Sequence, residues 1–243
     1  MWFDKKFASS VIFSLLIGNT VSLPAATPPL QSYDSQFFAL LKLAPRLDPH
    51  ALEAALTALN RLQAAGTKVR GDVLTIIDYT KPSTERRLWV FDLARTRVLF
   101  QEMTAHGKNS GDKQAVRFSN APNSLMTSLG AFLTGDTYMG KHGLSLRLQG
   151  LEKGVNDNSM ERAIVIHAAA YISDAIARNK GGIGRSWGCP AVRPEISRSL
   201  IESVRGGALV LAYYPDQSWL HNSKLAGLDP SIATTRSTIP NGG

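Results

Sequence analysis

One cysteine and one histidine carry the clearest chemical signal in this sequence. Cys189 is the only cysteine, and it lies in the run GRSWGCP at 184–190. His167 follows the apolar run 164–166, twenty-two residues before Cys189. A thiol with an unperturbed pKa of about 8.5 is mostly protonated at neutral pH. A neighbouring imidazole raises the fraction present as the reactive thiolate. The pair therefore predicts nucleophilic catalysis, with Cys189 as nucleophile and His167 as base.

The residues around Cys189 suit an acyl-transfer site. Gly188 allows close approach of a substrate, and the amides of Gly188 and Cys189 are expected to bind the negative oxygen of a tetrahedral intermediate, an interaction worth roughly 3 kcal/mol. Pro190 has no amide hydrogen, so such a donor must lie at or before Cys189. Ser186 is expected to shape the loop through a hydrogen bond from its side chain to the backbone.

The first residues have the pattern of an export signal. Two lysines at 5–6 precede a mostly apolar stretch at 7–23, and small residues follow at 24–26. Several polar residues interrupt the stretch, so it matches poorly the roughly 20 apolar residues of a membrane span. We predict a signal peptide over 1–25 and an exported protein of the periplasm or cell envelope, with no stable membrane span after cleavage. A lone cysteine in such a compartment indicates a reactive thiol, with a buried inert thiol or an intermolecular bridge as alternatives.

Composition limits the classes of function. The chain has 243 residues, 44% hydrophobic residues, a formal charge of +8 and a sequence pI of about 9.7. Such a basic chain suits an anionic polymer or surface, although a solvated basic face explains the charge equally well. The sequence lacks nucleic-acid-binding motifs, a P-loop, a dinucleotide fingerprint and a metal-ligand cluster. We therefore expect no nucleic acid partner, no metal and no cofactor.

The pattern of elements predicts a mainly β, α+β catalytic domain that positions these residues. Asp48 is a plausible N-cap of a helix that ends at Gly66. A further helix is predicted over Ser35–Leu43, and others over 173–179 and 194–205. Predicted strands, short and rich in β-branched, aromatic or alternating apolar residues, lie at 73–77, 87–91, 96–100, 144–148, 163–166 and 208–213. The segments are then a signal peptide (1–25), a lead-in and helical extension (26–70), the catalytic domain (71–215) and a flexible C-terminal tail (216–243).

The motifs resemble those of a known family. The strand-end His167 followed by Ser186-Trp187-Gly188-Cys189 is similar to the active-site signature of the YkuD-type L,D-transpeptidases, which cross-link peptidoglycan. The resemblance extends over about 72–214. The segment 128–132 stands where that family usually has a strand, and the segments 106–111, 138–147 and 184–191 are similar to a murein L,D-transpeptidase subgroup. The resemblance implies a YkuD-like β-sandwich or barrel with a short helical N-terminal extension.

The chain departs from the commoner family loop beside the nucleophile. Trp187 stands where that loop has a histidine, and Pro190 follows the cysteine where a basic or amide residue usually comes shortly after. Arg185 or Arg193 is then a candidate substitute for holding a substrate carboxylate. The candidate substrate-binding residues are His142, Lys141, His106, Arg185 and Trp187. For the two loop histidines and for Lys141, ordinary loop structure and surface solvation are the alternatives.

The resemblance also implies the reaction. Cys189 would attack a carbonyl of a peptidoglycan stem peptide, release D-alanine and pass the acyl group to an amine of a neighbouring stem. Transfer to water instead would make an L,D-carboxypeptidase or another cysteine peptidoglycan hydrolase. A non-catalytic cell-wall-binding protein is the remaining alternative. Papain-like and sortase-like enzymes fit less well, since their cysteine, histidine and arginine follow other orders and spacings.

Overall fold

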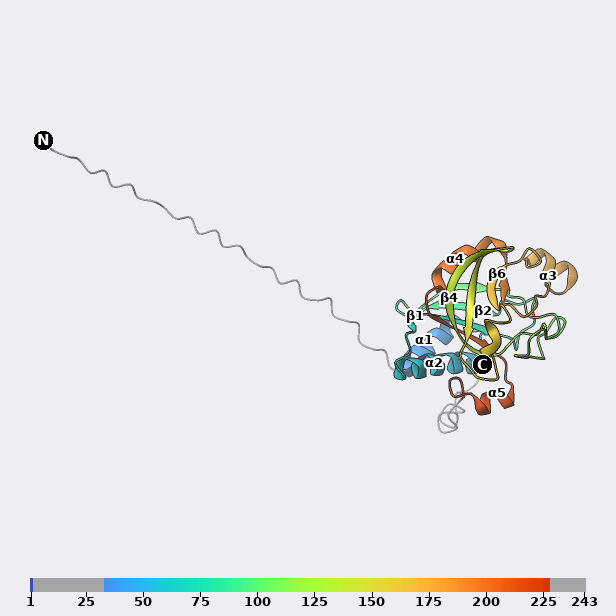
Figure 1. Ribbon diagram of the computed structural model, residues 1–243, viewed down its shortest axis with the longest axis horizontal. Coiled ribbons are helices and arrows are strands. Elements are labelled where there is room, and N and C mark those ends of the chain that lie inside the picture. The colour runs from blue at the N-terminus through green and yellow to red at the C-terminus, as the bar shows by residue number, and fades with distance from the viewer. Residues whose placement is uncertain (2–32, 228–243) are drawn as a thin grey trace. The chain divides into compact units, whose positions relative to one another are not determined.

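The computed structural model describes Met1 and residues 33–227 (Figure 1). Residues 33–227 belong to one compact unit. The predicted signal peptide, apart from Met1, and the end of the predicted tail from 228 onward lie outside the described residues. Within 33–227, no helix combines the length and the apolar character that crossing a membrane requires.

The strands of the described residues form one eight-stranded mixed sheet that is nearly closed into a barrel, in the order β3-β2-β1-β8-β4-β5-β6-β7. β1 pairs in parallel with β8, and β6 with β7, while the other pairs are antiparallel. The predicted mainly β fold is confirmed. The strands are β1 (Arg70–Asp78), β2 (Leu88–Asp92), β3 (Arg97–Glu102), β4 (Gly130–Gly140), β5 (Gly143–Gly150), β6 (Val165–Ala168), β7 (Ala191–Val192) and β8 (Ala208–Tyr213).

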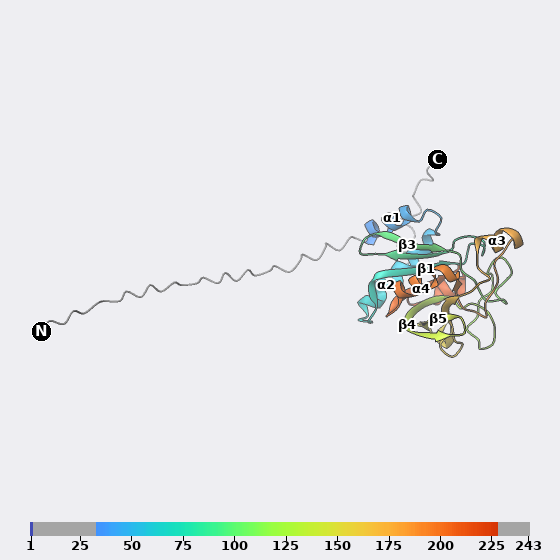
Figure 2. The same cartoon turned by 90° about the horizontal axis from the view of Figure 1, so that it is seen from above.

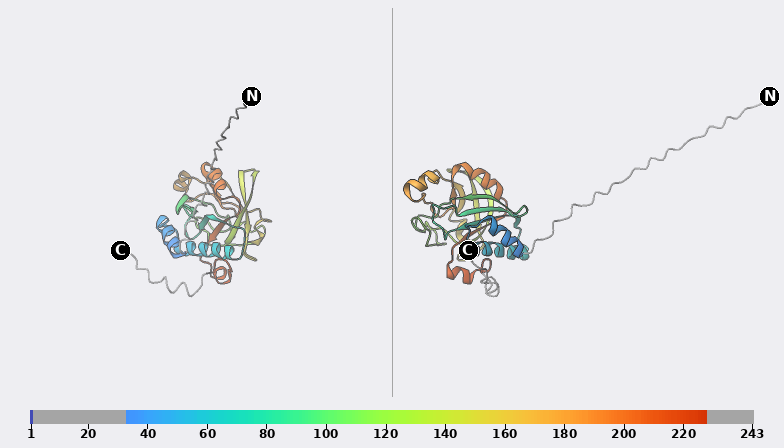
Figure 3. Two further views of the ribbon diagram at one scale, coloured as in Figure 1. Left: turned by 90° about the vertical axis from the view of Figure 1, so that its left-hand side faces the viewer. Right: turned by 180° about the vertical axis from the view of Figure 1, so that it is seen from behind.

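Both faces of the central strand β8 are buried, which explains its unbroken apolar sequence. Leu209 and Leu211 pack into one hydrophobic core together with helix α2 (Pro49–Ala64). Val210 packs into a second core on the other side, together with helix α4 (Pro194–Val204). Figures 1 and 3 show α2 and α4 on opposite sides of the strands. A strand covered on both faces has no alternation of polar and apolar residues, because neither side meets water.

The N-terminal helices form where the sequence predicts them. Helix α1 (Tyr33–Leu43) precedes α2. The Asp48 carboxylate accepts a hydrogen bond of 2.8 Å from the His50 amide and so caps α2, which begins at Pro49. An N-cap of this kind stabilises a helix by about 1 kcal/mol. The predicted start at Asp48 is confirmed.

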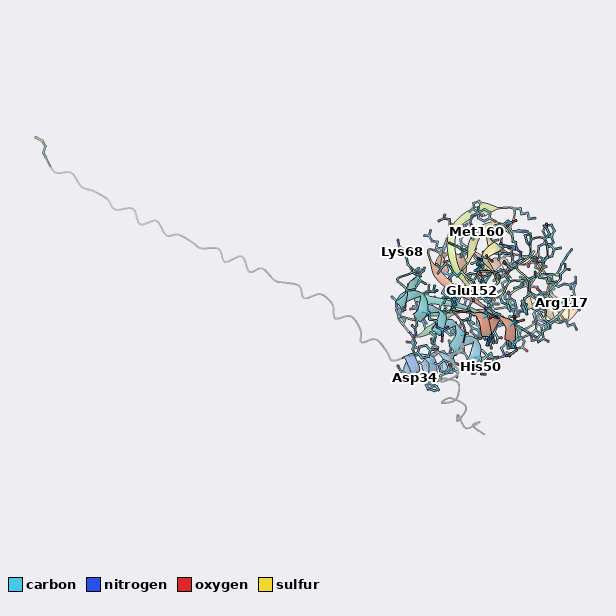
Figure 4. The ribbon with its side chains drawn as sticks, turned by 60° about the horizontal axis from the view of Figure 1, so that its bottom comes forward. Asp34, His50, Lys68, Arg117, Glu152 and Met160 are labelled. Carbon is cyan, nitrogen blue, oxygen red and sulfur yellow. The ribbon has the colours of Figure 1, made fainter. Side chains whose placement is uncertain are left out.

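The first part of the predicted flexible tail is a helix in the structure. Helix α5 (Gln217–Asn222) buries Trp219 against Tyr213, with ring centroids 6.1 Å apart. The Trp219 indole N–H donates to the Glu152 carboxylate over 3.2 Å, and Glu152 is labelled in Figure 4. Burial of an indole with a hydrogen-bond partner holds this segment on the sheet despite its polar composition.

The segment 151–164 contains a 3₁₀ turn, η1 (Asp157–Ser159), and begins at the end of β5 opposite the β4–β5 hairpin tip. The segment 103–129 and helix α3 (Asp174–Lys180) lie on one side of the folded unit, as Figures 1 and 2 show. Arg117 lies on that side in Figure 4, away from Lys68. The sequence analysis placed only the start of β4, by resemblance, because its interior is rich in glycine and polar residues.

Candidate active site

The segment 186–190 is a tight loop whose shape the Ser186 side chain maintains. Ser186 Oγ accepts a hydrogen bond of 3.0 Å from the Gly188 amide and donates one of 2.7 Å to the Cys189 carbonyl oxygen. Gly188 has φ +130°, and a Cβ at this position would lie 2.8 Å from the carbonyl oxygen of Met126. Only glycine fits, because any side chain would be strained and would collide with that oxygen. The loop thereby fixes the backbone of Cys189.

A parallel strand pair brings Cys189 and His167 together. β6 pairs with β7 so that His167 lies opposite Ala191. Cys189 comes two residues before Ala191 and therefore lies beside the same strand as His167, about one strand repeat away. The His167 ring is buried and the Cys189 side chain is half-buried. The Cys189 thiol donates to the carbonyl oxygen of Ala163 over 3.5 Å.

The hydrogen bond of His167 determines its tautomer. His167 Nδ1 lies 2.8 Å from the carbonyl oxygen of Ala168. A carbonyl oxygen only accepts, so Nδ1 carries the hydrogen and Nε2 keeps its lone pair. Burial lowers the pKa of His167, the charges of His142 and Lys141 lower it further, and the bond to Ala168 opposes them. At neutral pH the ring is neutral, and Nε2 is available as a base.

The thiol is also neutral at rest. Burial raises the pKa of Cys189, while the Val165 amide and the positive charges of Arg162 and Lys141 lower it. The net direction is upward, whereas the pKa of His167 moves downward. The pair therefore rests as thiol and imidazole rather than as thiolate and imidazolium. The proton has to move as the substrate is attacked.

One of the two amides expected to bind an oxyanion is already engaged. The Gly188 amide donates to Ser186 Oγ over 3.0 Å. The Cys189 amide donates no hydrogen bond within residues 33–227. The expected oxyanion site therefore reduces, in this structure, to the amide of the nucleophile itself.

The tip of the β4–β5 hairpin packs against His167 and Trp187. The His142 ring stacks on the His167 ring, with centroids 4.4 Å apart and planes at 23°. Lys141 Nζ lies 5.4 Å from the centroid of the Trp187 ring, and Trp187 is 69% exposed. Three of the candidate substrate-binding residues thus meet at the nucleophile, although they come from two distant segments of the chain.

His106 lies apart from this group and is fully buried. Its Nδ1 is 2.8 Å from Nη2 of the buried Arg87, which can only donate, so Nδ1 is the acceptor and Nε2 carries the hydrogen. That Nε2–H donates to the carbonyl oxygen of Gly111 over 3.4 Å. Burial, followed by the Arg87 charge, lowers the pKa of His106 to about 4. In this position the ring supports the 106–111 segment instead of facing solvent.

The two arginines considered as carboxylate ligands have partners of their own. Arg185 donates to the Gly111 carbonyl oxygen over 3.1 Å and lies 3.5 Å from the Asp112 carboxylate. Arg193 makes two hydrogen bonds of 2.8 Å to the Glu102 carboxylate. This bidentate pair leaves Arg193 engaged in holding the segment after β7.

Arg162 is a residue near the nucleophile that the sequence analysis missed. Its Nη2 would lie 3.2 Å from a Cβ at Gly188, so the guanidinium is packed against the loop. The charges of Arg162 and Cys189 act on each other's pKa. The only sequence signal was its place five residues before His167, which by itself indicates no function. Among the residues that the structure describes, no group of histidine, cysteine and carboxylate side chains is arranged to hold a metal ion.

Comparison with known proteins identifies the family. The model of the L,D-transpeptidase catalytic domain matches residues 43–213, which is more than two thirds of the chain. The chain belongs to this family. A search of curated proteins found no match.

Several solved structures are similar at low sequence identity. An L,D-transpeptidase from Mycobacterium smegmatis is 15% identical over 59% of this chain and 59% of its own, with a TM-score of 0.37. An L,D-transpeptidase from Enterococcus faecium is 13% identical over 67% of this chain and 64% of its own, with a TM-score of 0.34. One from Stackebrandtia nassauensis is 15% identical over 72% and 74%, also with a TM-score of 0.34. The chain thus spans about three fifths of the first of these structures.

Proposed function

We propose that this protein is a peptidoglycan L,D-transpeptidase that uses Cys189 as its nucleophile. The observation that carries the proposal is the pairing of β6 with β7, in which His167 lies opposite Ala191, two residues after Cys189. The bond from His167 Nδ1 to Ala168 leaves Nε2 as an acceptor for the thiol proton. The family match supports the class of reaction.

The proposed acylation step follows from these roles. Cys189 Sγ attacks the carbonyl carbon at the L-configured centre of the diaminoacyl residue in a tetrapeptide stem, and its proton passes to His167 Nε2. The amide of Cys189 stabilises the negative oxygen that forms. The C–N bond to D-alanine then breaks, and His167 returns the proton to the departing amine. A thioester on Cys189 and free D-alanine are the products.

The second step transfers the acyl group. An amine of a neighbouring stem attacks the thioester carbon, and the C–S bond breaks. The proton of the amine passes through His167 to the sulfur, which restores the resting thiol and neutral imidazole. Neither step consumes a nucleotide, because the thioester preserves the acyl group in activated form.

The hairpin tip supplies the proposed contacts to the stem. Lys141 lies over the exposed Trp187 ring and adds a positive charge at the surface of the site. A stem peptide is anionic, so an ammonium group here suits its carboxylates. His142 packs on His167 and limits its movement. In this proposal Lys141 and Trp187 contact the stem, while His106 and Arg185 support the loops behind it.

Action on peptidoglycan places the protein outside the cytoplasm. The proposed site is the periplasm or cell envelope, after removal of a signal peptide over residues 1–25. The basic composition suits the anionic wall.

Muropeptide analysis tests the proposal. Purified mature protein, Cys189→Ala and Cys189→Ser would each be incubated with tetrapeptide-rich wall fragments, and products separated by chromatography and mass spectrometry. We expect new dimers with the wild-type protein and none with either variant, because a hydroxyl is a far weaker nucleophile without a lowered pKa. Circular dichroism of the variants controls for folding.

The other outcomes separate the alternatives. Tripeptides without dimers would identify an L,D-carboxypeptidase, since water rather than an amine would have resolved the thioester. Binding to insoluble wall with no Cys189-dependent product would indicate a non-catalytic wall-binding protein and would overturn the proposal.

A further inference from the structure

Arg162 is a half-buried arginine in the segment that leads into β6. It follows η1 and precedes Ala163, whose φ of 51° turns the chain into β6. Its guanidinium donates only to uncharged oxygens. The partners are the carbonyl oxygens of Ser119 (2.7 Å) and Met126 (2.5 Å), Ser124 Oγ (3.2 Å) and Ser128 Oγ.

No carboxylate balances this charge within residues 33–227, where Arg162 forms no ion pair. Arg193, which is also half-buried, is paired with Glu102, whereas the fully buried Arg87 bonds carbonyl oxygens and His106. Burying a cation without an anion costs free energy, and burial lowers the pKa of Arg162 accordingly. A charge left unbalanced beside a nucleophile is available to stabilise negative charge that develops there.

The position of the guanidinium relates it to the nucleophile. Nη2 would lie 3.2 Å from a Cβ at Gly188, and the same nitrogen bonds the Met126 carbonyl that also crowds Gly188. Arg162 and the Met126 carbonyl that it binds therefore pack together against Gly188, the residue before Cys189. All four hydrogens of its two terminal nitrogens have acceptors, so the group is fixed and is not free to bind a substrate carboxylate.

We propose that Arg162 is a positioning residue for the Cys189 nucleophile. Its guanidinium holds the 119–128 segment against Gly188 and keeps an unbalanced positive charge beside the thiol, which stabilises the thiolate and the oxyanion during acylation. This inference rests on the proposed function of Cys189 and adds a residue to that site.

Other groups also face the thiol and have to be considered. Lys141 contributes positive charge from the hairpin tip. Tyr79 and Tyr171 interact with it as phenols whose pKa values burial raises to about 12, so they are neutral over the working range. His167 is neutral, with His142 stacked on it. Of the charges that favour the thiolate, that of Arg162 is the larger, ahead of Lys141.

The test measures the pH dependence of Cys189 alkylation. Wild-type protein, Arg162→Gln and Arg162→Lys would be labelled with iodoacetamide from about pH 6 to about pH 11, and the labelled fraction followed by intact mass. Arg117→Gln is the matched control: it removes the same charge from an exposed arginine whose side chain bonds only the Asn109 carbonyl.

We expect Arg162→Gln to move the alkylation midpoint upward by about one pH unit or more, because an opposite charge at this range shifts a pKa by one to three units. Arg162→Lys should stay within about 0.3 units of the wild type, while its acylation by a stem peptide falls because the forked hydrogen bonds are lost. Arg117→Gln should leave the midpoint unchanged.

An unchanged midpoint in folded Arg162→Gln would overturn the proposal. Should that variant fail to fold, Arg162→Lys decides: a midpoint raised by about one unit although the charge is retained would equally overturn it. Alkylation needs no peptidoglycan, so the result is independent of muropeptide analysis. If Arg162→Gln raises the alkylation midpoint as expected but the wild-type protein forms no cross-linked product, only the proposed transpeptidase function is contradicted.

Discussion

Two buried histidines in this molecule have opposite tautomers and different surroundings. His106 accepts a hydrogen bond at Nδ1 from Arg87 and donates from Nε2 to Gly111. His167 donates from Nδ1 to Ala168, and its Nε2 has no hydrogen-bond partner in the part of the chain that the structure describes. His106 follows β3 and His167 lies within β6, and burial is the largest cause of a lowered pKa in each. The neighbours, rather than the residue type, decide which ring can act as a base.

The two histidines also differ in how many ring nitrogens are hydrogen-bonded. His106 has both ring nitrogens engaged, and a guanidinium beside it opposes protonation. It therefore behaves as a neutral structural group over the whole physiological range. His167 has one engaged nitrogen within residues 33–227 and lies opposite Ala191, two residues after Cys189, so Nε2 can accept a proton. The proposed role of His167 as a base depends on Nε2, which has no hydrogen-bond partner within residues 33–227.

Exchange of each histidine for glutamine gives the largest expected contrast. His167→Gln should lower the rate of Cys189 acylation by about 10²–10⁴-fold, the usual contribution of a general base. His106→Gln should leave the acylation rate of the folded protein within about threefold of wild type, because no reacting atom contacts it. Both rates are measured by quenching reactions with a synthetic stem tetrapeptide at set times and determining the acylated fraction of the protein by intact mass spectrometry. Equal losses in the two variants would contradict the assignment of roles.

The stability of the protein should depend on pH through His106. Its pKa is about 4 in the folded state, against 6.5 in an unfolded chain, so only the unfolded state takes up this proton as the pH falls below 6.5. The free energy of unfolding should therefore decrease between pH 6.5 and about 4, by roughly 3 kcal/mol from this group. Denaturant unfolding at a series of pH values measures it.

The His106→Gln variant isolates that contribution. Glutamine does not titrate, so the fall in unfolding free energy below pH 6.5 should be smaller in the variant by that amount. An identical pH dependence in both proteins would show that His106 is protonated in the folded state, contrary to its hydrogen bond with Arg87.

Removal of the ring stacked on His167 should have the smallest effect. His142→Ala deletes a contact worth about 1 kcal/mol and a group that lowers the pKa of His167. The acid limb of the acylation rate, which reports neutral His167, should move to slightly higher pH, and the rate at neutral pH should fall by about two- to fivefold. A pH profile of acylation measures both changes. A shift of the acid limb to lower pH would contradict the stacking account.

Local sequence patterns were sufficient for much of the fold, and they are also the basis of the predicted catalytic pair. Asp48 identifies the start of α2, because an N-cap acts within a few residues. The apolar run of β8 identifies a doubly covered strand for the same kind of local reason. Cys189 and His167 stand out because their residue types and spacing are distinctive in a chain with one cysteine.

Features that depend on tertiary contacts could not be predicted from local sequence patterns. Arg162 is one of many arginines in the sequence, and its position against Gly188 exists only after the 119–128 segment folds over it. The tautomers of His106 and His167 depend on Arg87 and Ala168, whose approach no spacing indicates. Helix α5 depends on the burial of Trp219 beside Glu152, which overrides its polar composition.

The most direct test of the central claim is the mass of the protein during a single turnover with a stem tetrapeptide. Because Cys189 is the only cysteine, a thioester adduct can be assigned to it without ambiguity, by its sensitivity to hydroxylamine and its absence from Cys189→Ala. We predict an adduct that forms rapidly in the wild-type protein and in His106→Gln, and slowly in His167→Gln. Rapid formation of the adduct in His167→Gln, or turnover of the peptide by Cys189→Ala, would contradict the account.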